Sequence, residues 1–193
     1  MDTFTMKASE NDQFQILPLA EHPEFRERAM EIYRYSFPDN EYTDIARLPS
    51  LLPPEYQFDE WALVYESRAV GYLIIVFTDK IAYPLHLAVA KECRGKGFGT
   101  RAMEFINQEY ASYLVYFSVE TPSETAENQQ QRLARIRLYE RIGYQLTGIN
   151  VLDHGTLYTV MCRKTATDKE IATICEHVSM LSELFDATVT VAK

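Results

Sequence analysis

The chain has 193 residues and a formal net charge of −9, from 28 acidic and 19 basic side chains. This length is typical of one domain, and a hydrophobic content of 47%, with 12% aromatic residues, is sufficient for a buried core. The excess of acidic residues argues against a nucleic-acid-binding protein that is held by phosphate contacts.

The first residues, MDTFTMKASENDQF, are polar, so we expect a flexible tail over residues 1–12 and no signal peptide. The longest apolar run, YLIIVF, is too short to cross a bilayer. An odd number of cysteines without metal spacing predicts reduced thiols in a cytoplasmic protein; these are Cys93, Cys162 and Cys175. The histidines show no paired spacing either, so we expect no metal site.

The first half of the chain is rich in strand signals. We expect, in chain order, a strand at 14–19, an amphipathic helix at 22–37, a short polar helix around 40–49, a loop with three prolines at 48–56, and strands at 60–67, 69–79 and 82–91. Pro23 suits the first turn of the amphipathic helix. The short connection at Ser67-Arg68 predicts that the first two of the three consecutive strands form a hairpin.

The second half predicts alternating helices and strands. We expect a helix at 99–112, a strand at 113–120, a helix at 128–142, strands at 144–152 and 156–164, and a terminal helix at 167–185, which one further strand could follow. Gly143 lies where a helix-ending glycine belongs, and Asp153-His154-Gly155 predicts a turn. The middle of the chain has the order strand, glycine loop, helix, strand. This order predicts a right-handed crossover between parallel strands.

Three of the seven glycines lie in the segment CRGKGFGT (93–100), between an expected strand and an expected helix. In such a turn successive backbone N–H groups converge on one space, and the start of the helix adds positive potential. Glycine permits positive φ and close approach of the main chain, while Arg94 and Lys96 add charge. The spacing is neither that of a P-loop nor that of the dinucleotide-binding G-x-G-x-x-G. The segment therefore predicts a site for a pyrophosphate or a similar group.

The longer segment LAVAKECRGKGFGTRAMEFI (87–106) closely resembles the acyl-CoA-binding segment of the GCN5-related N-acetyltransferases, the GNAT family. The family signature, R/Q-x-x-G-x-G/A after a strand, is matched by Arg94, Gly97 and Gly99. A second segment, ARIRLYERIGYQLTG (134–148), resembles the part of the family in which a tyrosine precedes Gly-Phe or Gly-Tyr. Here that tyrosine is Tyr139.

The resemblance implies a mixed α/β architecture, the GNAT fold, with a mostly antiparallel central sheet and helices on both faces. The expected order of elements agrees with the family from about residue 13 to residue 163, and the final 30 residues lie outside the resemblance. We therefore expect a flexible tail at 1–12, an N-acetyltransferase domain at 13–163 and a C-terminal helical extension at 164–193 that packs on the same domain.

The resemblance also implies that acetyl-CoA is the co-substrate. It places the pantetheine arm beside the strand at 85–90, where a backbone N–H could stabilise the oxyanion. A splay between this strand and the strand at 113–120 would admit the ligand. The cofactor-binding residues implied are Leu87, Ala88, Val89, Arg94, Gly95, Lys96, Gly97, Phe98, Gly99 and Thr100.

Three side chains are candidates for general acid–base catalysis of acetyl transfer. Tyr139 is the candidate general acid, because a phenol with an ordinary pKa near 10 is protonated at neutral pH and can donate to a departing thiolate. Glu120 ends the expected strand at 113–120 and could accept the amine proton, through water or directly, or bind a cationic substrate. His86 has a suitable ordinary pKa, but its strand parity relative to Val89 is unfavourable unless a bulge intervenes, so we rank it below Glu120.

Arginines cluster just before Tyr139. On a helix, Arg132, Arg135 and Tyr139 share one face, so Arg132 and Arg135 could hold an acidic substrate group or pair with Glu120. The alternative is that they are solvated surface charges. Many GNAT proteins have an asparagine that contacts the cofactor seven residues before the tyrosine, where this chain has Arg132.

The function that these features predict is transfer of an acetyl group to the primary amine of a small molecule, by direct attack in a ternary complex without an acyl-enzyme. Two other functions fit the same motifs: a non-catalytic acyl-CoA-binding or regulatory domain, and a protein N-terminal acetyltransferase. The acidic charge mildly favours a cationic acceptor. We expect a monomer or homodimer that contacts neither nucleic acid nor membrane.

Overall fold

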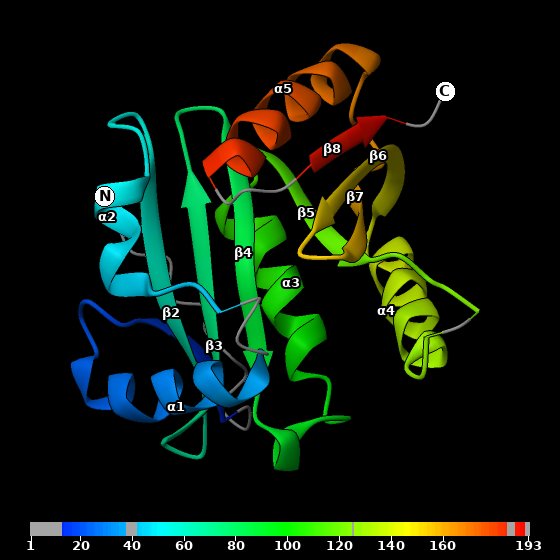
Figure 1. Ribbon diagram of the computed structural model, residues 1–193. Coiled ribbons are helices and arrows are strands. Elements are labelled where there is room, and N and C mark those ends of the chain that lie inside the picture. The colour runs from blue at the N-terminus through cyan, green and yellow to red at the C-terminus, as the bar shows by residue number, and fades with distance from the viewer. Residues whose placement is uncertain (1–12, 38–41, 125, 185–187, 192–193) are drawn as a thin grey trace. The chain divides into compact units, whose positions relative to one another are not determined.

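A computed structural model describes residues 13–37, 42–124, 126–184 and 188–191 (Figure 1). The expected tail at 1–12 lies outside these residues. The chain divides into two compact units, Met1–Ala111 and Ser112–Lys193, and each is described by itself. None of the helices in the described part of the chain is long and apolar enough to span a membrane.

The first unit is built on a four-stranded sheet. Its strands are β1 (Phe14–Pro18), β2 (Gln57–Tyr65), β3 (Arg68–Phe77) and β4 (Ile81–Val89). They lie side by side in chain order, and each is antiparallel to the next. Glu66 and Ser67, with φ of 49° and 59°, form a two-residue turn between β2 and β3. The expected hairpin is thereby confirmed.

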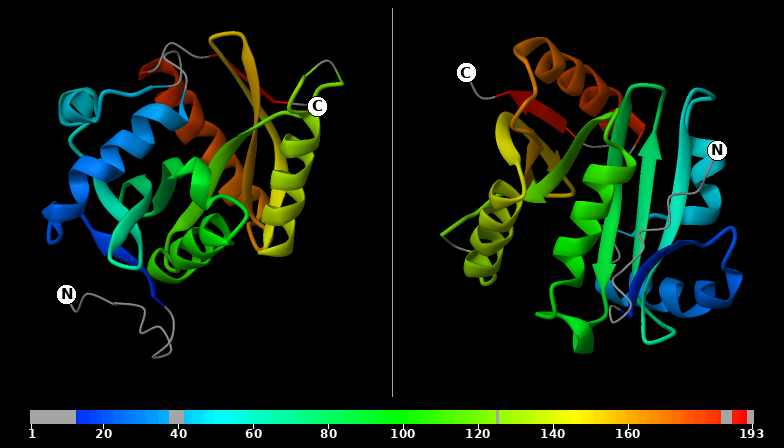
Figure 2. Two further views of the ribbon diagram at one scale, coloured as in Figure 1. Left: turned by 90° about the horizontal axis from the view of Figure 1, so that it is seen from below. Right: turned by 180° about the vertical axis from the view of Figure 1, so that it is seen from behind.

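Helices cover both faces of this sheet. The helices of the unit are α1 (Arg26–Ser36), α2 (Leu48–Leu51) and α3 (Phe98–Glu109). From α1, Tyr33 packs on Tyr72 of β3 at a ring distance of 5.2 Å. From α3, which runs along the strands as the green helix of Figure 2, Phe105 packs on Trp61 of β2 at 4.8 Å. Because Trp61 and Tyr72 lie on opposite sides of the sheet by strand alternation, the two helices cover opposite faces.

The segment before β2 differs from the expectation. In place of a polar helix around 40–49 there is a 3₁₀ turn, Ile45–Arg47, where the Asp44 side chain accepts a hydrogen bond from the Ala46 amide; residues 38–41 lie outside the described part. The turn continues into α2, which lies inside the expected loop at 48–56. Pro49 is compatible with a helix because it occupies the first turn, where its missing N–H has no intrahelical partner.

Gly71 allows β3 to pass unusually close to its neighbours. A Cβ atom at this position would lie 2.5 Å from the carbonyl oxygen of Ala88 on β4 and 2.9 Å from the side chain of Leu63 on β2. The register between β2 and β3 shifts at Leu63/Val64, beside this glycine. The carbonyl oxygen is part of the sheet and cannot move aside without disturbing the pairing of β3 with β4.

The second unit also has a four-stranded sheet. Its strands are β5 (Leu114–Glu120), β6 (Tyr144–Asp153), β7 (Thr156–Arg163) and β8 (Thr188–Val191). The spatial order is β5, β7, β6, β8, and all pairs are antiparallel. His154 and Gly155, with φ of 45° and 82°, make the expected turn between β6 and β7. The expected parallel crossover would join the two units and stays a prediction.

Helices α4 (Gln129–Arg141) and α5 (Asp168–Leu184) contact opposite faces of this second sheet. From α4, Tyr139 packs edge-on against Phe117 of β5. From α5, His177 meets Tyr116, the preceding residue of β5, with 2.5 Å between Nδ1 and the hydroxyl oxygen. Burial lowers the pKa of His177 to about 4, so a neutral histidine joins the terminal helix to the sheet.

The ends of these helices follow local rules. After α4, Gly143 has a φ of 101° and accepts from the Lys164 amide, as expected of a helix-ending glycine. Before α5, Thr167 and Glu170 exchange side-chain to main-chain hydrogen bonds in a capping box. The last residue of the expected helix, Phe185, lies outside the described residues. The expected division into a domain at 13–163 and an extension at 164–193 stays a prediction.

We predict that Gly71→Ala lowers the free energy of unfolding by about 1–3 kcal/mol, because the added methyl group overlaps a main-chain oxygen. Urea denaturation followed by circular dichroism measures the change. The control is Gly99→Ala, whose Cβ would meet no atom within 4 Å in the first turn of α3 and which we expect to be neutral or slightly stabilising. Equal stability of Gly71→Ala and the wild type would contradict the close approach of the strands.

Candidate functional site

The glycine loop lies between the end of β4 and the start of α3. A 3₁₀ turn, Lys91–Cys93, leads from the strand into the loop. Gly95 and Gly97 have φ of 79° and 84°, and Gly97 is the residue that precedes the first turn of α3. Two of the three glycines are therefore required by the backbone conformation, because other residues rarely adopt positive φ.

Six successive amides of this loop, from Gly95 to Thr100, have no main-chain partner. The first hydrogen bond of α3 runs from the Arg101 amide to the Gly97 carbonyl, at 3.1 Å. Within the described ranges, none of the six amides before Arg101 donates to another main-chain atom. A Cβ on Gly95, Gly97 or Gly99 would meet no atom within 4 Å, so the loop is open on the Cβ side of these three glycines. The loop thus has the donors and the room that a diphosphate needs.

The side chains of the loop have different roles. Phe98 is buried and stacks on Phe14 of β1 at a ring distance of 4.8 Å, so its ring anchors the start of α3 and only its amide is available to a ligand. The Arg94 side chain donates from Nε to the Val89 carbonyl at 3.2 Å. Arg94 and Lys96 are both exposed, and they place positive charge at the surface of the loop.

Strand β4 presents two different faces to its surroundings. The pairing of β4 with β3 is regular from His86 to Val89, and the one register shift lies before His86, between Ile74 and Ile75. His86 and Val89 therefore point to opposite faces, as their parity predicts. Ala88 is buried in a cluster with Ile32 of α1, whereas Leu87 and Val89 are half-buried on the other face. Any contact of Ala88 with a ligand must use its main chain.

His86 is packed beneath α1. Its ring lies 4.6 Å from that of Phe37 and 5.0 Å from that of Tyr33, and Nε2 is 3.3 Å from the Thr43 hydroxyl. Burial lowers the pKa of His86 to about 4, so the imidazole is neutral at pH 7 and a weak base. These contacts favour a structural role, and the assignment of His86 as a base stays a prediction.

In the second unit, Tyr139 is half-buried on α4. Its ring meets Phe117 at 4.8 Å in an edge-on arrangement. Its hydroxyl makes no hydrogen bond with the residues that the structure describes. Burial raises the pKa of Tyr139, and the guanidinium of Arg135 opposes that rise. The phenol is therefore protonated at neutral pH and free to donate a hydrogen bond.

Glu120, at the end of β5, is bound by two arginines of α4. Arg132 lies 2.8 Å from Oε1 and Arg135 lies 2.5 Å from Oε2. Of the alternatives that the sequence leaves open, pairing with Glu120 is the one found. Because each carboxylate oxygen already carries an ion pair, Glu120 is less available as a proton acceptor, and its role as a base stays a prediction.

Two polar contacts of this cluster had no signal in the sequence. Arg132 donates from Nε to Oδ1 of Asn128 at 2.7 Å and from Nη1 to the carbonyl oxygen of Thr121 at 2.8 Å. The Thr121 hydroxyl in turn lies 2.7 Å from that of Thr159 on β7. Arg132 thus uses its guanidinium to bind the chain itself, at the position where many GNAT proteins have asparagine.

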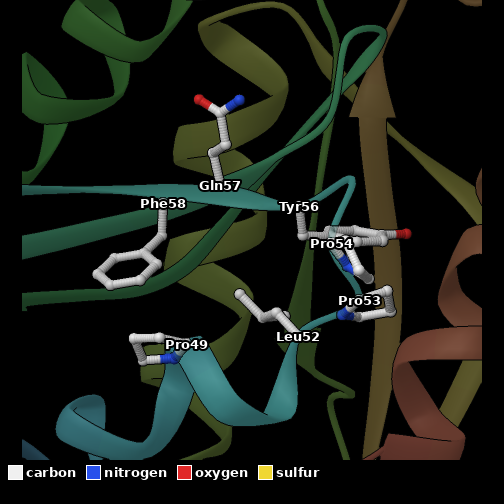
Figure 3. A pocket seen from close by; sticks show the side chains of 7 residues that line it. All are labelled: Pro49, Leu52, Pro53, Pro54, Tyr56, Gln57 and Phe58. Atoms are coloured by element: carbon white, nitrogen blue, oxygen red, sulfur yellow. The ribbon is translucent and has the colours of Figure 1, made fainter.

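A separate pocket of about 400 Å³ lies between α2 and the start of β2 (Figure 3). In Figure 3, Leu52, Pro49 and Phe58 face one another across part of the pocket. The lining residues are Pro49, Leu52, Pro53, Pro54, Tyr56, Gln57 and Phe58. None of the residues that the sequence analysis singled out for chemistry lines it.

Comparison with known proteins finds one family model that matches part of the chain. Residues 59–146, which begin in the first unit and end in the second, match the family model of the acetyltransferase (GNAT) domain. This segment of the chain is similar to the acetyltransferase domain of the GNAT family. The resemblance noted in the glycine loop and around Tyr139 is thereby confirmed. No curated protein sequence matches the chain.

Solved structures agree on the GNAT fold. A protein from Bacteroides thetaiotaomicron assigned to the GNAT family has a TM-score of 0.65 and 19% identity, covering 89% of this chain and 97% of that chain. The ribosomal-protein-S18-alanine N-acetyltransferase from Escherichia coli has a TM-score of 0.56 and 17% identity, covering 80% and 97%. An aminoglycoside 6'-N-acetyltransferase complexed with coenzyme A has a TM-score of 0.56 and 17% identity, covering 77% and 95%. The expected mixed α/β fold class is confirmed.

We predict that Gly97→Asp weakens the binding of coenzyme A at least about tenfold. The new carboxylate would compete for the loop amides and would repel the negatively charged diphosphate. Isothermal titration calorimetry measures the affinity. The matched control is Gly155→Asp, since Gly155 has nearly the same φ (82° against 84°) and equally open surroundings but lies in the β6–β7 turn. If both variants bind coenzyme A like the wild type, the loop is not the diphosphate site.

Proposed function

We propose that this GNAT protein is an acetyl-CoA-dependent N-acetyltransferase that acts on the primary amine of a small molecule, by direct attack in a ternary complex. The observation that carries the proposal is the run of six unpartnered amides from Gly95 to Thr100. Open space beside three glycines and two exposed cations at the same loop support it. Acetyl-CoA, when bound, supplies an acetyl group activated as a thioester.

The residues of the first unit would hold the co-substrate. The six loop amides would bind its diphosphate, with Arg94 and Lys96 adding favourable charge. By the family resemblance, the main chain of Leu87, Ala88 and Val89 would hold the pantetheine arm, and an amide there would stabilise the oxyanion. Cys93 packs against the apolar cluster of Ala88 and Ala90, which supports direct attack by the amine rather than an acyl-enzyme.

The proposed general acid, Tyr139, belongs to the second unit. The amine nitrogen attacks the thioester carbonyl, the carbon–sulfur bond breaks, and Tyr139 gives its phenolic proton to the departing thiolate. Water then returns a proton to the phenolate. The proton that the amine loses goes to water, because His86 is a weak, buried base and both oxygens of Glu120 are bound to arginines.

The acceptor is proposed to be a small cationic amine. The net charge of −9 favours attraction of cations. Among proteins of similar fold, the aminoglycoside 6'-N-acetyltransferases are named for aminoglycosides, and the ribosomal-protein-S18-alanine N-acetyltransferase for a protein. We further propose that the protein works in the cytoplasm, which its three free thiols support. We propose that it is a monomer or homodimer.

We predict that Tyr139→Phe lowers kcat for amine acetylation by about 10²-fold or more while leaving the affinity for acetyl-CoA unchanged, because the ring stays and only the donor is lost. Thiol release from acetyl-CoA, measured over a panel of amines and peptides, gives both the acceptor and the rate. The matched control is Tyr144→Phe, since the Tyr144 ring meets the same Phe117 at the same 4.8 Å and 67°.

The outcomes separate the candidate functions. Amine-dependent thiol release with small amines, but not with peptides, supports the proposal. Thermal stabilisation by acetyl-CoA without thiol release for any acceptor would instead indicate a binding or regulatory domain. Full kcat in Tyr139→Phe across the pH range would contradict the role of Tyr139 as general acid.

A further inference from the structure

The two arginines that bind Glu120 differ in how fully they are used. Arg132 has a side chain that is only 16% exposed, and it binds Glu120, Asn128 and Thr121. Arg135 has a side chain that is 45% exposed, and its one ion pair among the described residues is with Oε2 of Glu120. Arg132 therefore fastens α4 to the end of β5, whereas Arg135 binds only Glu120 among the described residues.

Arg135 lies one helical turn before Tyr139. Residues four positions apart on a helix are neighbours on its surface, so the guanidinium and the phenol lie on the same face of α4. The positive charge of Arg135 lowers the pKa of Tyr139, which burial raises. Glu120 accepts a hydrogen bond from Nη2 of the same guanidinium, and this contact limits the positions that the Arg135 side chain can take.

We propose that Glu120 and Arg135 form a positioning pair for Tyr139: the carboxylate holds the guanidinium beside the phenol, where its positive charge stabilises the phenolate that proton donation leaves behind. This inference rests on the proposed general-acid role of Tyr139. It gives Glu120 a different task from that of a base, since the carboxylate acts through Arg135 without touching the reacting atoms.

Among the described residues, Arg135 is the charged group that acts on the pKa of Tyr139. Phe117 of β5 is apolar, and Tyr144 at the start of β6 is a buried phenol whose pKa burial raises to about 12. Arg163 of β7 lies opposite Tyr144 in the strand register and hydrogen-bonds to that residue. Arg135 is therefore the charged group whose removal acts most directly on Tyr139.

The expected effect follows from the sign of the interaction. A positive charge favours the phenolate, so Arg135→Met raises the pKa of Tyr139 and weakens it as an acid. We expect kcat to fall about tenfold and the alkaline limb of the kcat–pH profile to move upward by about one pH unit, while the affinity for acetyl-CoA is unchanged. Arg135→Lys, which keeps the charge, restores most of the rate, and Glu120→Gln gives a smaller loss than Arg135→Met.

The test that does not depend on turnover follows the ζ-carbon of ¹³C-labelled tyrosine in the full chain from about pH 8 to about pH 11, with folding checked by circular dichroism. The Tyr139 signal, assigned with Tyr139→Phe, should stay protonated to higher pH in Arg135→Met than in the wild type. The matched control is Arg137→Met, an exposed arginine two positions further along α4, which should leave both the titration and kcat unchanged.

The outcomes distinguish this inference from the proposed function. The positioning pair is wrong if the pKa of Tyr139 is the same in Arg135→Met as in the wild type, or if Arg137→Met changes that pKa by the same amount as Arg135→Met. This holds even where Tyr139→Phe abolishes turnover. If Arg135→Met raises the pKa of Tyr139, but neither Arg135→Met nor Tyr139→Phe changes kcat, then Tyr139 is not the general acid. The catalytic part of the inference is then wrong as well. A higher pKa of Tyr139 in Arg135→Met, together with a lower kcat and an alkaline shift of the kcat–pH profile, supports both the positioning pair and the general-acid role.

Discussion

Main-chain amides that have no hydrogen-bond partner are the feature on which the account of this protein depends. Buried amides are nearly always paired, and the first amides of a helix stay free only where solvent, a side chain or a ligand can reach them. Here the loop before α3 adds further unpartnered amides to those of the first helical turn, because Gly95 and Gly97 adopt positive φ. The result is a run of six donors beside open space, with the positive end of a helix behind them.

The rest of the first unit serves to hold that loop in place. The buried Phe98 ring locks the start of α3 against β1, and the Arg94 side chain ties the loop back to the end of β4. Gly71 lets β3 pass close to β4 just where β4 ends. The ring stacking and the side-chain hydrogen bond limit the conformations of the loop, which lowers the entropy cost of ordering its amides when a ligand binds.

Much of this could be predicted from the sequence because the signals are local. Glycine spacing predicted the loop, helical periodicity predicted α3, and Gly143 predicted where α4 ends. The family resemblance then supplied the fold, which the comparisons confirm. The sequence also predicted that Arg132 and Arg135 share a face of α4, and both of them bind Glu120.

Other features depend on tertiary contacts, which periodicity does not encode. The sequence left open whether the two arginines pair with Glu120, because α4 and the end of β5 are brought together only by packing. The ordinary pKa of a histidine made His86 a candidate base, and only the packing of α1 over β4 lowers that pKa to about 4. The short helix α2 was missed because its prolines favour a loop by composition, although Pro49 falls in the one turn that accepts it.

The central claim is that the amides from Gly95 to Thr100 bind the diphosphate of coenzyme A. The most direct measurement is a ¹H–¹⁵N correlation spectrum of the uniformly labelled chain, recorded as coenzyme A is added. The account predicts that the six amide signals move together, mostly downfield, and saturate at one common affinity, while the Gly155 amide in the β6–β7 turn stays in place. Saturable binding of coenzyme A that leaves all six loop amides unmoved would contradict it.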